Sequence, residues 1–171
     1  MDHACNIAVA RYKSDGRLDQ TFGDGGITLV DIKGTDDMAH GMVLQPDGAI
    51  VLAGTAADKQ AGVVHPFVAR LDANGALDAS FNENGVALMS EVDGAAQCVT
   101  VLSNGVIVTG GYVAVSDQDD PGQPVAHEVF AVMAHRPDGQ VMSDFGRKGL
   151  LTIDLADEAT ATAAQPDGRI V

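Results

Sequence analysis

Ala69-Arg-Leu-Asp-Ala-Asn-Gly-Ala-Leu-Asp-Ala-Ser-Phe-Asn82 is one copy of a phrase that the chain repeats at 10–23 and 134–146. The phenylalanine of the phrase is Phe22, Phe81 and Phe145 in the three copies, which places the copies 59 and 64 residues apart. Recurrence at a nearly constant spacing is the signature of a repeat architecture, in which the repeat is the unit that folds. The fold is therefore predicted from one repeat, not from the whole chain.

A second phrase lies between these copies. It reads Gln-Pro-Asp-Gly-Ala-Ile-Val at 45–51, with variants at 102–108 and 165–171. Each repeat places Asp-Gly or Asn-Gly between short apolar runs rich in β-branched residues, a pattern that predicts two-residue hairpin turns joining short strands. Over one period the pattern predicts four strands, at 39–45, 49–56, 65–72 and 85–92.

Four antiparallel strands per period predict an all-β fold, namely a β-propeller of four-stranded blades, with about three blades' worth of strands in the chain. The chain is then a single repeat domain over 1–171 that divides, in order, into a partial blade 6–33, a blade 37–92, a blade 94–155 and a partial blade 157–171. A parallel β-helix is the competing all-β fold, but its rungs do not require a hairpin at every second strand.

Closed propellers normally contain four to eight blades, more than this chain supplies. We therefore expect that another copy of the chain or another polypeptide completes the ring, or that the chain is a piece of a longer one. Phe22, Phe81 and Phe145 are expected at the contacts between blades. They are the largest apolar side chains at a repeated position of a chain that has no Trp and 4% aromatic residues.

Two charged positions of the first phrase change together between copies. Arg11 and Asp19 match Arg70 and Asp78, and both positions become apolar, Ala and Met, in the third copy. Loss of one member of a buried ion pair leaves an uncompensated charge, whereas replacing both members can be neutral. The sequence thus predicts two structural ion pairs, each across a hairpin, in preference to catalytic groups.

Both phrases, in this order, resemble the delta-60 repeat, a β-propeller repeat of bacterial proteins. The resemblance covers nearly all of the chain. It is weakest in the third copy, where Val-Met-Ser-Asp at 141–144 replaces Leu-Asp-x-(Ser/Thr). The resemblance implies a propeller of the kind found within larger surface or secreted proteins, and it implies no established activity.

Charge and composition exclude some classes of partner. The 24 acidic and 10 basic residues give a net charge of −14, which argues against binding to nucleic acids or anionic membranes. No apolar run approaches the roughly 18 residues of a membrane span. No signal peptide is visible in this chain, so we expect either a cytoplasmic protein or a processed secreted or surface protein.

Candidate ligand residues are few. Asp117, Asp119 and Asp120 form the densest carboxylate group, in the loop that lengthens the second period, and calcium is the one cofactor that their spacing suits. The rest of a calcium-binding loop is absent, so a solvated acidic loop is the favoured interpretation. His65 and His127 both lie just before a predicted third strand, where they would share a rim and could face one ligand or metal ion.

The sequence predicts a binding or interaction module of unknown ligand, without enzymatic activity and without assigned catalytic residues. One alternative is an enzyme with an active site in the central channel, like propeller glycosidases. Another is a structural spacer of a larger surface protein. The start of each predicted first strand, at 38–40, 95–97 and 159–161, carries mostly small residues, which favours the binding module over channel chemistry.

Overall fold

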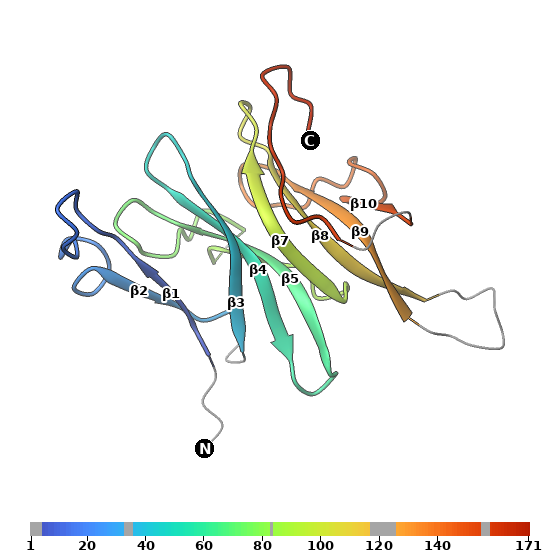
Figure 1. Ribbon diagram of the computed structural model, residues 1–171, viewed down its shortest axis with the longest axis horizontal. Helices are drawn as coiled ribbons and strands as arrows, with labels where there is room; N and C mark the ends of the chain where they lie inside the picture. The colour runs from blue at the N-terminus through green and yellow to red at the C-terminus, as the bar shows by residue number, and fades with distance from the viewer. Residues whose placement is uncertain (1–4, 33–35, 83, 117–125, 155–157) are drawn as a thin grey trace.

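Three antiparallel sheets stand side by side in the computed structural model, which describes residues 5–32, 36–82, 84–116, 126–154 and 158–171 (Figure 1). The first sheet has two strands, and the second and third have four each. The predicted all-β propeller fold with four-stranded antiparallel blades is thereby confirmed. Within the described residues, no helix has the length and apolar character needed to cross a membrane.

The strands follow one another in each sheet in the order in which they occur in the chain. The first sheet contains β1 (Ile7–Ala10) and β2 (Ile27–Val30). The second contains β3 (Asp37–Leu44), β4 (Ile50–Asp58), β5 (Val63–Leu71) and β6 (Val86–Leu88). The third contains β7 (Gly94–Val101), β8 (Ile107–Ser116), β9 (Ala126–His135) and β10 (Leu150–Ile153). All pairings are antiparallel, so the parallel β-helix alternative is wrong.

The hairpin turns differ from the predicted two-residue type. In the turn between β3 and β4, Gly48 N–H donates to the Gln45 carbonyl at 2.9 Å, and Gln45 N–H donates to the Ala49 carbonyl at 2.8 Å. Only the glycine has a positive φ, of 88°. This is the three-residue loop that combines a type I turn with a glycine bulge, in which Pro46 pre-sets the first turn position. The same pair of hydrogen bonds closes the turns at 13–17, 72–76, 102–106, 136–140 and 165–169.

A bulge recurs in the first strand of both four-stranded sheets. Pairing of β3 with β4 shifts between Ala39 and Gly41, and pairing of β7 with β8 shifts between Ala96 and Cys98. Glycine is required opposite each bulge, because a Cβ at Gly54 or Gly111 would overlap the carbonyl oxygen of the facing first strand. The repeated Gly that follows the apolar run of each second strand therefore has a steric origin.

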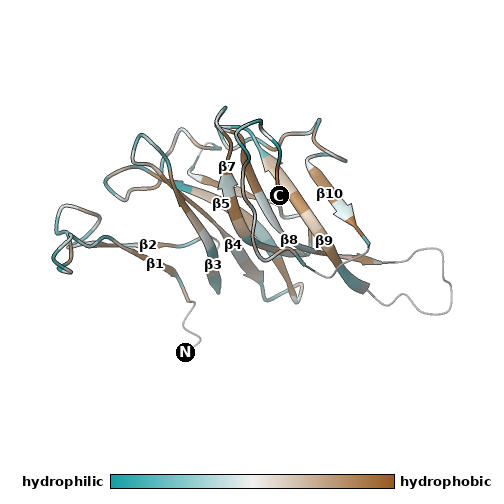
Figure 2. Cartoon of the chain, turned by 45° about the horizontal axis from the view of Figure 1, so that its top comes forward, coloured by the Kyte–Doolittle hydropathy of each residue, from teal (hydrophilic) through white to brown (hydrophobic). Residues whose placement is uncertain are grey.

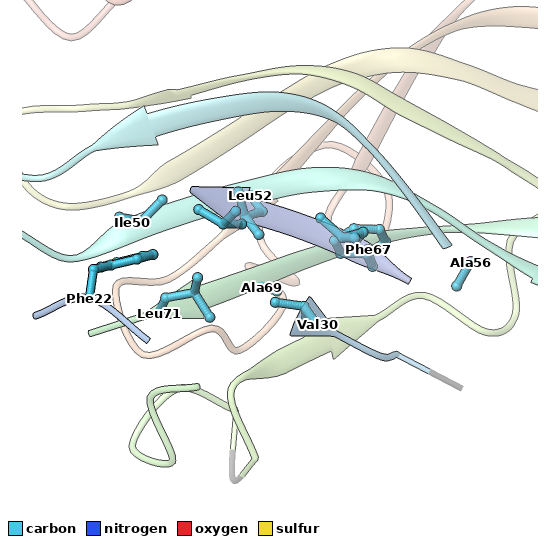
Figure 3. Close-up of a cluster of buried hydrophobic side chains, with 10 residues drawn as sticks. Phe22, Val30, Ile50, Leu52, Ala56, Phe67, Ala69 and Leu71 are labelled. Atoms are coloured by element: carbon cyan, nitrogen blue, oxygen red, sulfur yellow. The ribbon is translucent and has the colours of Figure 1, made fainter. Parts of the chain in front are cut away.

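The hydrophobic core lies between the sheets. In Figure 2 much of the apolar colouring lies on the strands, whereas the hairpin loops of the first sheet are paler or hydrophilic. Between the first two sheets, Phe22 is fully buried and belongs to one cluster with Val30 of β2, Leu52 of β4 and Leu71 of β5 (Figure 3). Phe81 is also fully buried, in the cluster that joins the second sheet to Ile107 of β8.

The third repeat phenylalanine is less well covered. Phe145 is only half-buried, and the described residues contain no complete sheet beyond the third that could cover its ring. Residues 158–171 form a hairpin closed by the turn at 165–169, and Ala159 N–H donates to the Gly111 carbonyl of β8 at 3.0 Å. This hairpin begins a further layer against the third sheet.

Replacement of single repeat phenylalanines by alanine should distinguish the fully buried ring of Phe81 from the half-buried ring of Phe145 by the loss of stability. We expect Phe81→Ala to lower the free energy of unfolding by about 3–5 kcal/mol, because it leaves a cavity between two sheets. Phe145→Ala should cost less than half as much, because its ring is already partly exposed. Urea denaturation followed by far-UV circular dichroism measures both, and equal losses would contradict the packing described for Phe145.

Candidate functional site

The carboxylates of the predicted calcium site, Asp117, Asp119 and Asp120, lie outside the described residues. Their role stays a prediction. Among the residues that the structure does describe, no three His, Cys, Asp or Glu side chains are grouped so that they could hold a metal ion.

The two histidines expected on a common rim occupy different positions of the repeat. In β5, Phe67 pairs with Gly54 of β4, and His65, two residues earlier, pairs with Ala56. In the third sheet, the glycine equivalent to Gly54 pairs with Ala131. His127 is therefore two residues out of register with His65, and the prediction of equivalent positions is wrong. Both side chains lie within strands and not before them.

Each imidazole has its own surroundings. His65 is 6% exposed, and its Nδ1 lies 2.8 Å from the Val92 carbonyl, so it is held inside the protein. His127 is partly exposed, and its Nε2 lies 3.5 Å from Asp154 Oδ1. The buried position of His65 removes it from a rim on which it could meet a ligand together with His127.

Arg11, Asp19 and Phe22 form a clamp between the first two sheets. Arg11 Nε donates to Asp19 Oδ2 at 2.9 Å, and its Nη1 donates to the Ala73 carbonyl of the next sheet at 2.6 Å. The guanidinium also lies over the Phe22 ring, 4.8 Å from its centre. The ion pair with Asp19 thus orients the Arg11 guanidinium. This group covers the ring of the buried Phe22 and hydrogen-bonds to the neighbouring blade.

Arg70, Asp78 and Phe81 repeat this clamp between the second and third sheets. Arg70 Nε donates to Asp78 Oδ2 at 2.8 Å, Nη1 donates to the Pro137 carbonyl at 2.6 Å, and the guanidinium carbon lies 4.8 Å from the Phe81 ring centre. The structure therefore forms both ion pairs that the sequence predicts. Each pair lies across a hairpin of one blade, and its arginine also hydrogen-bonds to the next blade.

In the Leu-Asp-x-(Ser/Thr)-Phe motif, the Ser or Thr hydroxyl hydrogen-bonds to the Asp carboxylate. The Ser80 hydroxyl donates to Asp78 Oδ1 at 2.6 Å, and this hydrogen bond, with smaller contributions from the Ser80 N–H and Arg70, holds the pKa of Asp78 below its usual value. Thr21 lowers the pKa of Asp19 in the same way. The hydroxyl keeps the carboxylate ionised and aligned for the arginine.

The third copy keeps the backbone of the clamp and loses its charges. Met142 N–H donates to the Ala134 carbonyl at 2.9 Å, as Asp78 N–H does to the Arg70 carbonyl at the same distance. The side chains at these two positions cannot form an ion pair. The residue two places beyond Met142 is Asp144, in the position of Thr21 and Ser80, and it lies 3.7 Å from Arg136 on the exposed surface.

An uncovered apolar surface lies beside the first sheet. Of the described strands, β1 pairs only with β2, and a groove of about 290 Å³ runs between its other edge and β3. Residues of three strands line the groove: Ala8, Val9 and Ala10 of β1, Ala39, His40, Gly41 and Met42 of β3, and Leu52 of β4. We call this groove, together with the exposed side chains of Met38, Met42 and Leu44, the β1–β3 face.

Comparison of equivalent strands shows why this face is uncovered. In β7, Val99 and Val101 pack against the second sheet, where Val43 and Val51 cover them together with Phe81. The equivalent residues of β3 are Met42 and Leu44, and they are 64% and 69% exposed. The first sheet has counterparts of β5 and β6 but none of β3 and β4 among the described strands, and those counterparts would cover Met42 and Leu44.

A second hollow of about 360 Å³ lies where the β4–β5 hairpin meets the third sheet. Its lining includes the carboxylates of Asp58, Asp93 and Glu128 and the half-buried Tyr112. Burial, followed by the negative charges of Glu128 and Asp93, raises the pKa of Tyr112. The lining also includes Lys59, so three carboxylates stand against one ammonium group and the hollow disfavours anionic ligands.

Two features were missed by the sequence reasoning. The exposure of Met42 and Leu44 was not predicted, because an alternating apolar strand carries the same pattern whether or not a neighbour covers it. The second is His135, which is 1% exposed and has no hydrogen-bond partner for either ring nitrogen among the described residues. Its repeat equivalent is Leu71, which is the signal that could have identified a histidine in a core position.

The charge clamp predicts a specific double-mutant result. Arg70→Ala should destabilise the protein by about 2–3 kcal/mol, because it leaves the Asp78 carboxylate and the Pro137 carbonyl without their charged donor. Arg70→Ala combined with Asp78→Met reproduces the third copy and should recover part of that loss. Chemical denaturation of the single and double variants tests the coupling, and strictly additive losses would refute a coupled pair.

His135 predicts a pH dependence of stability. Burial lowers its pKa from 6.5 to about 4, so the unfolded chain takes up a proton before the folded one does. His135 therefore removes up to about 3 kcal/mol of stability as the pH falls from 6.5 to 4, and nothing further below that. His135→Leu, which matches Leu71, should be more stable at pH 7 and should lose this part of the acid sensitivity. Parallel unfolding profiles of the two proteins across this pH range would contradict the assignment.

Comparison with known proteins agrees with this architecture. Residues 45–81 match a family described as Domain of unknown function (DUF5122) beta-propeller, and this segment covers β4, β5 and the second copy of the clamp. A search of curated proteins gave no match to the chain. The match supports the resemblance to the delta-60 repeat. The chain is thus a β-propeller repeat protein that carries, at 45–81, the signature of this family of unknown function.

Proposed function

We propose that this protein is an interaction module that binds partner β-strands on its β1–β3 face. The observation that supports the proposal is the exposure of Met42 and Leu44, at positions where the equivalent Val99 and Val101 of β7 are packed under a neighbouring sheet. Binding there would cover apolar side chains and pair the backbone of the open edge of β1 at the same time.

The chemistry of the face fits a strand pair better than a small molecule. The side chains of Met42 and Leu52 supply apolar surface in the groove, while the β1 edge offers backbone donors and acceptors at the spacing of a strand. Addition of a strand to an open sheet edge draws affinity from main-chain hydrogen bonds and specificity from side chains on the covered face. The occupant should therefore be a short β-hairpin with apolar residues on one face.

A peptide from the protein itself provides the test. Residues 37–58 contain β3 and β4, the strand pair that holds the corresponding place beside β5 in the second sheet. We expect a fluorescently labelled 37–58 peptide to bind a single copy of the chain saturably, as measured by fluorescence anisotropy. The proposed contact predicts weaker binding for a Val51→Asp peptide, because the residue equivalent to Val51 would face Met42 and Leu44.

Controls on the protein side locate the site. Leu44→Asp should abolish peptide binding without unfolding the protein, because Leu44 is 69% exposed. Ser90→Asp adds the same charge at an exposed position away from the β1–β3 face and should leave binding unchanged. Failure of the wild-type peptide to bind, or equal binding to the Leu44→Asp variant, would refute the proposed function.

A further inference from the structure

We propose that the hollow between the β4–β5 hairpin and the third sheet binds a basic segment of a partner protein, with one lysine or arginine side chain inserted into the hollow. This surface is separate from the β1–β3 face, so the two proposals stand or fall independently. Three features of the molecule support the new site: the lining of the hollow, the division of charge between the two rims of the sheets, and departures from the repeat.

The hollow combines apolar walls with acidic side chains. Its volume is about 360 Å³, and its apolar lining includes Val63 and Val64 of β5 and Ala114 of β8. Lysine and arginine bury their methylene stems along apolar surface and keep the charged head beside polar groups. The hollow therefore suits one long basic side chain better than a compact, fully hydrated ion.

Two of the three lining carboxylates are placed to receive the charged head. Glu128 is exposed and forms no hydrogen bond or ion pair within the described part of the chain. Asp93 Oδ1 accepts the Val64 N–H at 3.3 Å, which holds this carboxylate beside β5. Asp58 Oδ1 accepts two N–H groups of its own hairpin, at 3.0 Å each. Glu128 and Asp93 are therefore the groups that we expect to contact the cation.

The ammonium group in the lining is paired with an acid outside it. Lys59 Nζ lies 3.2 Å from Asp36 Oδ2, and Asp36 does not line the hollow. Burial raises the pKa of Tyr112, and the charge of Glu128 raises it further, so the hydroxyl of Tyr112 lies in a negative potential. An aromatic ring close to carboxylates is suited to binding a cation.

Charge is divided between the two rims of the sheets. The rim with the hollow contains the end of β4 and the starts of β5 and β7, on the lower side in Figure 1. Nine described carboxylates lie at this rim against Lys59: Asp31, Asp36, Asp37, Asp58, Glu91, Asp93, Glu128, Asp154 and Glu158. The other eight described basic residues lie at the opposite rim, where carboxylates nearly balance them: Arg11, Lys13, Arg17, Arg70, Arg136, Arg147, Lys148 and Arg169. The rim with the hollow should therefore attract cationic partners.

Two residues of the hollow depart from the repeat. By the alignment of the second phrase, Tyr112 of β8 occupies the position of Thr55 in β4. By strand pairing, Glu128 occupies the position of Val64. Glu128 pairs with Ala114, two residues from Tyr112, so both departures lie on one face of the third sheet. The second sheet forms without a phenol or a carboxylate at these positions, which favours a binding role for the pair over a structural one.

A model peptide tests the chemistry of the partner. A fluorescently labelled peptide in which lysine alternates with glycine should bind the full chain saturably, as measured by fluorescence anisotropy. Added salt should weaken the binding, because it screens the attraction. The matched peptide with glutamate in place of lysine should not bind. Absence of binding by the lysine peptide would overturn the proposal. Competition by spermidine with equal affinity would overturn it too, because a small polycation would then replace the peptide as ligand.

Substitutions that follow the repeat locate the site. Tyr112→Thr combined with Glu128→Val introduces the residues of the second sheet, so the fold should persist while binding weakens at least about tenfold. Glu128→Gln removes only a charge and should weaken binding about threefold to fivefold. Asp47→Asn removes the same charge at the opposite rim, matches the asparagine of the next repeat, and should leave the affinity unchanged. Wild-type affinity in the double variant, or equal effects of Glu128→Gln and Asp47→Asn, would overturn the site.

The fluorescence of Tyr112 provides a local measurement. The chain has no Trp and two Tyr, so Tyr12→Phe leaves Tyr112 as the only Tyr. Titration of this variant with the unlabelled lysine peptide should change the tyrosine emission with the affinity found by anisotropy. Binding without a change in emission would place the peptide elsewhere and overturn the proposal. Leu44→Asp, which alters the β1–β3 face, should bind the lysine peptide like the wild type, so failure of one site is distinguishable from failure of the other.

Discussion

Contact between neighbouring sheets is the constraint on which the structure depends. A four-stranded antiparallel sheet that is apolar on both faces cannot cover either face by itself, so each sheet must be packed between two others. Phe22 and Phe81 fill these contacts, and the arginine above each ring bonds to a carbonyl of the next blade. Wherever the neighbour is missing or incomplete, apolar side chains such as Met42 and Leu44 become surface.

The clamp shows how one junction combines several weak interactions. An aspartate held ionised by a Ser or Thr hydroxyl aligns the arginine, and the arginine covers the phenylalanine while it satisfies a backbone carbonyl of the next turn. Partly exposed ion pairs contribute little singly, but a charged group with several good hydrogen bonds contributes more. Because the third copy carries Ala and Met at these two positions, it lacks the contribution of the ion pair.

His135 illustrates the opposite case, in which a repeat position departs from the pattern at a cost. The equivalent residues in the other copies of the repeat are apolar or aromatic. His135 is almost fully buried, and both of its ring nitrogens lack a hydrogen-bond partner within the described residues. Burial without hydrogen bonds disfavours the charged imidazole. The residue thereby makes the stability of the sheet that contains β9 depend on pH.

The sequence by itself determined the repeat, the four strands of each blade, the positions of the buried phenylalanines and the partners of the arginines, because these depend on local spacing and turn chemistry. The tertiary structure decided the remainder. It showed that the turns are three-residue loops, that His65 and His127 are out of register, and that one face of β3 is exposed. Hydrophobic alternation specifies which face of a strand is apolar, but only the presence or absence of a neighbouring sheet decides whether that face is core or binding surface.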